Sequence, residues 1–190
     1  MRFRTLISGF TLIEMLVTLA VLAILGTLAA PSFVSQRRNA ELTSVTNEFV
    51  AAIYAVRSEA MKRNMNGLLI PKIANTGWTS GWIGFVDADF SGTYNEGDTL
   101  VIERGAVDSS IQISATGTAS GNTAYLLYNG SGFVKQKDNS LGGSTVELQR
   151  TDNAMAQYTR RIMIAKTGRV RTCTPTHLST DTNCSSTNSD

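Results

Sequence analysis

The sequence predicts an α+β protein in which one long N-terminal helix is followed by a head of antiparallel β-strands. Three observations lead to this prediction. Residues 10–30 are almost entirely apolar, residues 42–60 place apolar side chains at helical spacing, and beyond residue 64 short β-prone runs alternate with Gly, Ser, Thr and Asn. We therefore divide the chain into a leader (1–9), an apolar helix (10–30), an amphipathic continuation of the helix (31–64) and a β-rich globular head (65–190).

The apolar stretch from Phe10 to Ala30 is long enough to cross a membrane. A helix rises about 1.5 Å per residue and a bilayer core is about 30 Å thick, and the stretch contains 21 residues. The leader before it carries Arg2 and Arg4 and no acidic residue, which favours its retention on the cytoplasmic side. We expect a single transmembrane helix that leaves the head on the opposite side of the membrane.

Glu14 is the only charged residue inside that apolar stretch. A carboxylate costs roughly 2.5 to 3.5 kcal/mol at mid-bilayer and less near an interface, so an unpaired one requires an explanation. An ordinary secretory signal would have a shorter apolar core, no acid within it and a cleavage site after it. Here the candidate cleavage point between Gly9 and Phe10 comes before the apolar stretch, so cleavage leaves the helix attached to the head.

The hexapeptide GFTLIE, from Gly9 to Glu14, resembles the prepilin signal of type IV pilins and type II secretion pseudopilins. The resemblance implies that a prepilin peptidase cuts between Gly9 and Phe10 and methylates the new amino group of Phe10. It also implies that Glu14 pairs with the terminal amine of a neighbouring subunit. Such a pairing has a physical reason, because opposite charges at low dielectric offset each other's desolvation only when they meet.

Beyond residue 30 the helical period continues along one face. Apolar positions follow each other at steps of three and four, whereas charged residues such as Arg57 and Lys62 fall mostly elsewhere. We expect one helix from about Phe10 to Asn64, whose outer half packs on the head and whose inner half packs on other helices. The predicted buried stripe comprises Leu42, Val45, Phe49, Ala52, Ile53, Val56 and Ala60.

The head is predicted to be mostly antiparallel sheet. Its short β-prone runs are separated by turn residues, and no helical period is sustained. The Ser/Thr/Gly-rich segment 115–123 is predicted to be an exposed loop. The expected strands are 68–70, 82–86, 100–104, 111–114, 124–128, 145–149, 158–165 and 169–173.

Several phrases in the head resemble the GspH/FimT family of minor pilins and pseudopilins. They are GW at 77–78, GWIGFVD at 81–87, YNGSGF at 128–133 and TGRVR at 167–171. The resemblance extends from Gly9 to Cys173 and implies the pilin fold, a long N-terminal helix packed on an antiparallel β-sheet head. Trp78 and Trp82 could form a binding platform, but aromatic residues at a strand start usually belong to the core, and we expect them there.

The sequence gives little support for catalysis. His177 is the single histidine, it lies in a Ser/Thr-rich stretch, and no nucleophile or nucleotide-binding motif accompanies it. Cys173 and Cys184 lie beyond the apolar helix, where an oxidising compartment is expected. Together with His177 they match no usual zinc spacing. We therefore expect a disulfide between the cysteines, no metal, no cofactor and no enzymatic activity.

The segment from Asp87 to Asp98 repeats the ligand spacing of a calcium-binding EF-hand loop. Asp87, Asp89 and Ser91 occupy positions one, three and five, and Gly92 occupies position six. Strands rather than helices are expected on both sides, however, and Asp98 replaces the bidentate Glu of position twelve. An acidic turn whose side chains bond their own backbone explains the same residues, and we prefer that interpretation.

Charge is distributed unevenly, although the net charge of the chain is only +2. Residues 87–108 contain six acidic side chains and one basic one, whereas residues 135–171 contain eight basic and three acidic ones. A basic face of this kind can meet the phosphates of nucleic acid or the acidic face of a neighbouring subunit.

The GRVR tetrapeptide at 168–171 is the sharpest candidate site on that face. In a strand, Arg169 and Arg171 point to the same side about 7 Å apart, close to the spacing of successive phosphates, and Gly168 lets the backbone approach. Guanidinium groups suit phosphate oxygens, and the resemblance to FimT-like minor pilins of naturally competent bacteria implies binding of double-stranded DNA. Further candidates are Lys135, Lys137, Arg160, Arg161 and Lys166.

These observations predict a non-enzymatic minor type IV pilin. We expect it to be a single-pass protein of the bacterial inner membrane with a periplasmic head, and then to join major and minor pilins in an extracellular pilus, near the tip, where it binds DNA for natural transformation. Two alternatives stay open. One is a FimU-like minor pilin that initiates assembly without binding DNA, and the other is a GspH-like pseudopilin of type II secretion.

Overall fold

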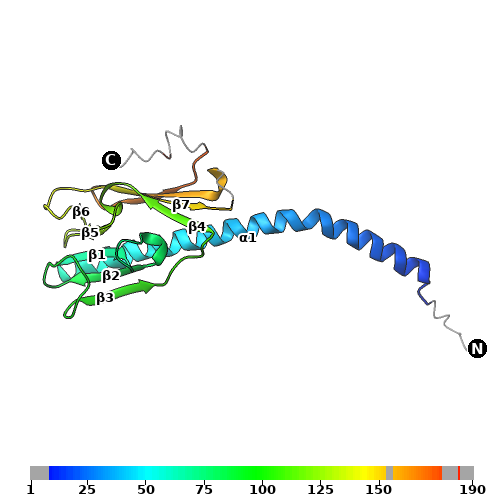
Figure 1. Ribbon diagram of the computed structural model, residues 1–190, viewed down its shortest axis with the longest axis horizontal. Helices are drawn as coiled ribbons and strands as arrows, with labels where there is room; N and C mark the ends of the chain where they lie inside the picture. The colour runs from blue at the N-terminus through cyan, green and yellow to red at the C-terminus, as the bar shows by residue number, and fades with distance from the viewer. Residues whose placement is uncertain (1–8, 153–155, 177–183, 185–190) are drawn as a thin grey trace, which may run out of the picture. The chain divides into compact units, whose positions relative to one another are not determined.

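The structure, a computed structural model, describes residues 9–152, 156–176 and 184. The chain forms two compact units, Met1–Ala40 and Glu41–Asp190. One helix, α1 (Leu12–Arg63), contributes to both (Figure 1). Its bounds agree with the helix predicted from about Phe10 to Asn64.

In the first unit, α1 presents apolar side chains to solvent. Among the described residues of the chain, none of the helices meets both the length and the apolar character required of a membrane span. The exposed large apolar side chains of this unit are Phe10, Leu12, Ile13, Met15, Leu16, Val17, Leu19, Val21, Leu22, Ile24, Leu25, Phe33 and Val34.

In the second unit, α1 buries one face in the head. Leu42, Val45, Phe49, Ala52, Ile53, Val56 and Ala60 are each at most 5% exposed, which confirms the predicted stripe. The helix ends in a Schellman motif: Asn64 adopts φ 54°, its N–H donates to Met61 O, and the N–H of Met65 donates to Ala60 O. This ending turns the chain directly into the first strand.

The head contains two antiparallel sheets (Figure 1). Sheet A has the strand order β3-β2-β1-β5-β6 and sheet B the order β4-β7-β8-β9. The strands of sheet A are β1 (Asn66–Pro71), β2 (Trp82–Asp87), β3 (Thr99–Arg104), β5 (Leu126–Tyr128) and β6 (Val134–Lys135). Those of sheet B are β4 (Ile111–Ala115), β7 (Ser144–Arg150), β8 (Thr159–Ile164) and β9 (Val170–Cys173). Three short 3-10 helices, η1 (Trp78–Ser80), η2 (Gly117–Ala119) and η3 (Ala156–Tyr158), complete the described elements.

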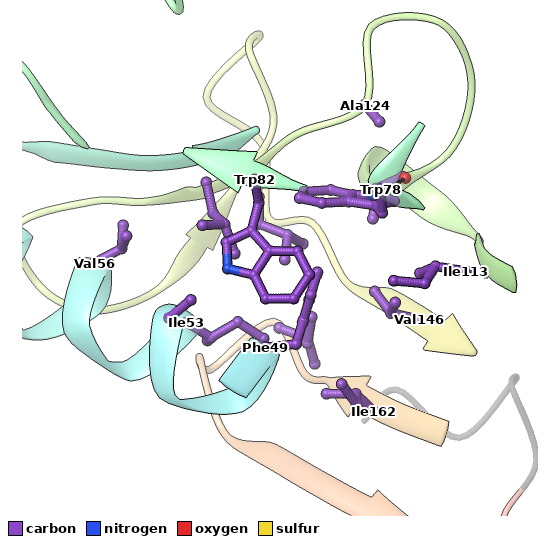
Figure 2. Close-up of a cluster of buried hydrophobic side chains, with 14 of the residues drawn as sticks. Phe49, Ile53, Val56, Trp78, Trp82, Ile113, Ala124, Val146 and Ile162 are labelled. Atoms are coloured by element: carbon purple, nitrogen blue, oxygen red, sulfur yellow. Dashed lines mark hydrogen bonds between the residues drawn. The ribbon is translucent and has the colours of Figure 1, made fainter. Parts of the chain in front are cut away.

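The core lies where α1 meets both sheets (Figure 2). Phe49 of α1 packs edge-on against Trp78 and Trp82, with ring centroids 5.1 and 4.9 Å apart. Both tryptophans are at most 2% exposed, so the prediction that they belong to the core is confirmed. Val146 and Ile162 close the cluster from sheet B.

The expectation of an exposed loop at residues 115–123 is wrong in part. Ala119, in η2, is fully buried, and its carbonyl oxygen accepts the indole N–H of Trp78 at 2.7 Å. A buried indole N–H usually has an acceptor, and for Trp78 the backbone of this small-residue segment supplies it.

Candidate nucleic-acid interface

The GRVR tetrapeptide begins in the turn of the β8–β9 hairpin. The N–H of Ala165 donates to Arg169 O at 2.9 Å, and the N–H of Gly168 donates back to Ala165 O at 2.8 Å. Three residues, 166–168, therefore form the loop, and Gly168 adopts φ 81°. A three-residue hairpin loop commonly ends in such a left-handed residue, which glycine adopts without steric cost.

Gly168 has a second structural role that the sequence did not reveal. The residue is buried, and a Cβ atom there would lie 2.1 Å from Gly132 O and 3.0 Å from the guanidinium carbon of Arg57. The close approach made possible by this glycine is thus to a neighbouring turn of the same chain.

Three cationic side chains of this hairpin are exposed: Lys166, Arg169 and Arg171. Those of Lys166 and Arg169 make no hydrogen bond or ion pair with any described residue. Arg171 faces Met163 across the β8–β9 ladder and donates only to its sulfur, at 3.5 Å. None of the three is neutralised by a carboxylate within the described part of the chain, so together they form what we call the cationic hairpin.

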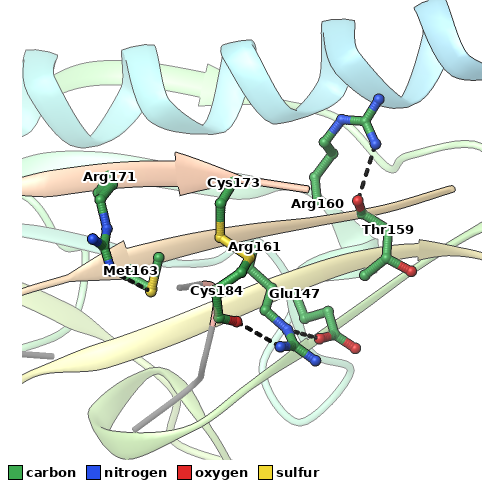
Figure 3. Close-up of a disulfide and its surroundings, with 8 residues drawn as sticks. All are labelled: Glu147, Thr159, Arg160, Arg161, Met163, Arg171, Cys173 and Cys184. Carbon is green, nitrogen blue, oxygen red and sulfur yellow. Dashed lines mark hydrogen bonds and ion pairs between the residues drawn. A yellow bond between two sulfur atoms is a disulfide. The ribbon is translucent and has the colours of Figure 1, made fainter. Parts of the chain in front are cut away.

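Arg160 and Arg161, although adjacent in β8, leave the strand on opposite faces (Figure 3). Arg160 points toward α1, donates to Gln157 O at 2.9 Å and Thr159 O at 3.0 Å, and reaches Thr43 Oγ1 at 3.4 Å. Burial lowers the pKa of its guanidinium. Arg160 is thus partly buried and held by contacts within the head.

Arg161 is held on the other face, beneath the disulfide (Figure 3). It is 8% exposed, it forms an ion pair with Glu147, and its Nη1 donates to Cys184 O at 2.6 Å. The Cys173–Cys184 disulfide is formed, with the Cα atoms 5.9 Å apart, as the sequence predicts. By fixing Cys184 beside β9, it keeps Arg161 covered.

Lys135 lies in β6 of the other sheet, and Lys137 lies in the turn that follows this strand. Lys135, in β6, donates its ammonium to Asn139 O at 2.9 Å. Lys137 is exposed and lies over the ring of Tyr125, 5.2 Å from the centroid. These two further candidates are therefore not part of the cationic hairpin.

Arg150, another basic residue of the 135–171 segment, is buried and paired with acidic side chains. It is 4% exposed, pairs with Asp152 and reaches Glu41 of α1 at 2.9 Å. The hydrogen bonds that this guanidinium donates to Asp152 raise its pKa. Its charge is compensated inside the head and does not contribute to a surface for phosphates.

The acidic loop after β2 bonds its own backbone. Asp87 accepts the N–H groups of Ser91 and Gly92 at 3.0 and 2.9 Å, and Asp98 accepts those of Ala88 and Asn95. The carboxylates of Asp87, Asp89 and Asp98 lie within 4.8 Å of one another. Burial raises the pKa of Asp87. The hydrogen bonds confirm the predicted acidic turn.

At the N-terminal end, Gly9 and Phe10 are exposed and precede α1. Thr11 and Glu14 form a capping box: the N–H of Glu14 donates to Thr11 Oγ1 at 3.3 Å, and the N–H of Thr11 donates to Glu14 Oε2 at 3.3 Å. In the single chain, Glu14 thus has local donors. The T-x-x-E pattern of a capping box is visible in the sequence. The resemblance to prepilins, however, implies only one partner for the Glu14 carboxylate, the terminal amine of a neighbouring subunit.

Arg57 is a site residue that sequence reasoning missed. It lies on α1, yet its Nε donates to Gly132 O and its Nη2 to Thr167 O. These backbone acceptors are 75 and 110 residues away in the sequence. Because every residue has a backbone carbonyl, the residue types at the acceptor positions do not reveal this contact, and the sequence could not predict it.

Comparisons with known proteins agree with this architecture. The family model described as type II transport protein GspH matches residues 45–168, and that of the prokaryotic N-terminal methylation motif matches residues 5–30. A comparison with curated proteins finds no match. The crystal structure of the type IV minor pilin FimU from Pseudomonas aeruginosa PAO1 in space group P21 is similar, with 19% identity, a TM-score of 0.54, and coverage of 69% of this chain and 87% of that one. A second FimU crystal form, in space group P65, gives 16% identity, a TM-score of 0.47, and coverage of 73% and 91%.

The long N-terminal helix, the antiparallel sheets and the methylation motif define a pilin-like protein. The chain belongs to the GspH family, whose model covers most of the head. The fold is that of a pilin, since it is similar to the minor pilin FimU.

Proposed function

We propose that this protein is a minor type IV pilin whose cationic hairpin binds double-stranded DNA for uptake. One observation carries the proposal: of the basic residues in the 135–171 segment, Lys166, Arg169 and Arg171 gather on one exposed hairpin without a described carboxylate partner. Arg150 and Arg161 are instead buried in ion pairs. Local positive charge that the fold does not neutralise is available for phosphates.

The contacts of such a hairpin are to the sugar-phosphate backbone. Arg169 and Arg171 flank the partly buried Val170 and lie about 7 Å apart at the strand rise. Contacts of this kind fix a protein on a duplex but carry no sequence information. We therefore expect little sequence preference and strong salt dependence.

The decisive experiment is a gel-shift titration of duplex DNA with the full-length chain in nonionic detergent. Replacing both arginines, R169Q with R171Q, should weaken binding and lower the magnitude of the log-log salt slope by about 1.8, because each phosphate that is no longer neutralised accounts for about 0.9. The matched control, R37Q with R38Q, removes the same charge from α1 outside the hairpin and should retain the affinity. Equal retardation by wild type and the R169Q/R171Q variant would remove these arginines from the proposal.

We propose the membrane and assembly steps from the N-terminal motif. A prepilin peptidase cuts after Gly9 and methylates Phe10. The exposed apolar side chains from Phe10 to Leu25 anchor the chain in the inner membrane with its head in the periplasm. The same side chains then pack against other pilins in the extracellular fibre. A position near the tip would leave the cationic hairpin accessible.

A second function is favoured by the matched family, whose description is that of type II transport. As a pseudopilin, the protein would be needed for secretion of exoproteins and not for pili. A FimU-like role in priming assembly is the other alternative. Gene deletion separates the three: lost DNA uptake with pili intact indicates the DNA-binding pilin, lost pili indicates the priming subunit, and lost secretion with pili intact indicates the pseudopilin.

A further inference from the structure

Two turns of the head, 129–133 after β5 and 165–169 between β8 and β9, are packed against each other. The N–H of Val134 donates to Lys166 O at 3.0 Å. Gly132 and Gly168 adopt φ 78° and 81°, and a Cβ on Gly168 would collide with Gly132 O. The contact therefore requires glycine in the hairpin loop, and it joins sheet A to sheet B at the cationic hairpin.

Arg57 bridges these two turns from α1. Its Nε donates to Gly132 O at 3.0 Å and its Nη2 donates to Thr167 O at 3.3 Å. Its guanidinium carbon also lies 6.0 Å from the centroid of the Tyr128 ring. The forked donor geometry of arginine allows one side chain to hold two carbonyls of different segments, which the single ammonium of lysine does not reproduce.

Within the described residues, Arg57 forms no ion pair with a carboxylate. Its side chain is half-buried, and two of its N–H groups are used by the two turns. The described partners of the Arg57 side chain are thus mainly the backbone carbonyls of the two turns. The neighbouring Val56 is fully buried, so the helix that carries Arg57 is fixed in the core.

We propose that Arg57 is a positioning residue for DNA binding: it fixes the β8–β9 loop against the 129–133 turn, so that Lys166, Arg169 and Arg171 are presented together. This inference rests on the proposed function. Binding is tighter when a loop is ordered before the ligand arrives, because less conformational entropy is lost on association. Arg57 acts through the hairpin and does not itself touch the phosphates.

The test compares Arg57→Lys with Arg63→Lys in the full-length chain in nonionic detergent. Both variants keep the charge and lie on α1, but Arg63 pairs with Glu59 and contacts Thr99 instead of the turns. With duplex DNA as the probe, R57K should bind about tenfold more weakly, the change expected when one hydrogen bond to a charged group is removed. Its salt slope should fall in magnitude by about 0.9, equivalent to one phosphate, because the cations no longer engage together. R63K should match wild type in both.

Hydrogen exchange, measured on the same three proteins without DNA, provides an independent readout. R57K should exchange faster at the amides of Val134 and Gly168, with the core strands unchanged. The inference is overturned if R57K binds DNA with the affinity and the salt slope of wild type. It is also overturned if R57K binds more weakly with an unchanged salt slope and a lowered Tm, because the loss then reflects reduced stability of the fold. If wild type itself fails to retard DNA, the proposed function is overturned together with the positioning role, and the exchange rates still decide whether Arg57 holds the two turns.

Discussion

At the scale of the residue, burial and pairing decide which charges of this protein are available. Arg160 and Arg161 are adjacent in the sequence, yet one reaches toward Thr43 of α1 and the other lies beneath Cys184. Lys166 and Arg169 are exposed and meet no described carboxylate. The number of basic residues in a segment therefore overstates the positive charge that its surface presents. For a phosphate ligand, the exposed basic residues of the cationic hairpin are the relevant ones.

Tyr128 offers a prediction at this scale. Its hydroxyl is buried and has no hydrogen-bond partner among the described residues, and burial raises its pKa. Because an unsatisfied buried hydroxyl costs about 1 to 3 kcal/mol, Tyr128→Phe should raise the free energy of unfolding by about 1 kcal/mol, as measured by denaturant titration.

The control for this change is Tyr125→Phe. The hydroxyl of Tyr125 accepts the N–H of Lys137 at 3.0 Å, so its removal should lower the free energy of unfolding by about 1 kcal/mol. A larger loss for Tyr128→Phe than for Tyr125→Phe would show that the Tyr128 hydroxyl is satisfied after all.

Residue identity predicted some site features and could not predict others. The cysteine pairing followed from the presence of two cysteines in an oxidising setting. The burial of Trp78 and Trp82 followed from their being aromatic residues at a strand start. The direction of Arg160 depends on strand register, because residues of β8 alternate between the core and the outer face. The register is set by long-range pairing, which the local sequence does not show.

At the scale of the element, local pattern predicted most of the secondary structure. Each of the eight expected strands overlaps an observed one, because each had an apolar run bounded by turn residues. The strand that was missed, β6, has two residues, Val134 and Lys135, too few to show alternation. The burial of Ala119 in the 115–123 segment was missed for a different reason, since it depends on the indole of Trp78, 41 residues away.

The β9 strand and its disulfide support a prediction about this element. Cys173 ends β9, and the bond to Cys184 closes a segment with a sequence separation of 11. Replacing both cysteines by serine should lower the free energy of unfolding by about 3 kcal/mol, mainly because the unfolded chain regains entropy. Denaturant titration of the double variant against wild type measures the loss.

Reducing agent provides the control for the disulfide prediction. It should destabilise the wild type by a similar amount and leave the double-serine variant unchanged. A loss below about 1 kcal/mol in both experiments would mean that the contacts of Cys184, including the hydrogen bond from Arg161, hold the segment without the covalent bond.

At the scale of the whole molecule, the two ends of α1 have different surroundings. The part within Glu41–Asp190 buries its apolar stripe in the head, whereas the part within Met1–Ala40 exposes apolar side chains such as Leu16 and Leu22. Exposed apolar area of this extent calls for a lipid or protein environment. This requirement fits a subunit that is anchored first and assembled later, as we propose.

Glu14 supports a prediction about assembly. Glutamine can replace glutamate in a capping box, so Glu14→Gln should keep the helix start. It should remove the charge that we propose pairs with the amine of Phe10 in a neighbouring subunit. We expect this variant to be processed normally, as shown by mass spectrometry of its N-terminus, and to be absent from sheared pili on immunoblots.

Thr11→Ala is the matched variant for assembly. It removes the capping hydroxyl, at a cost of about 1 kcal/mol to the helix start, but leaves the charge of Glu14 in place, and it should still enter pili. Incorporation of Glu14→Gln at the wild-type level would contradict the proposed pairing of charges.

The Thr11–Glu14 capping box also bears on the proposed assembly of subunits into a fibre. Since the carboxylate has local donors in the lone chain, meeting a neighbour's amine swaps one set of contacts for another. The free-energy gain of docking is then the difference between two bound arrangements, smaller than the full value of a new ion pair. In the fibre that we propose, such an exchange of contacts would favour reversible addition of subunits.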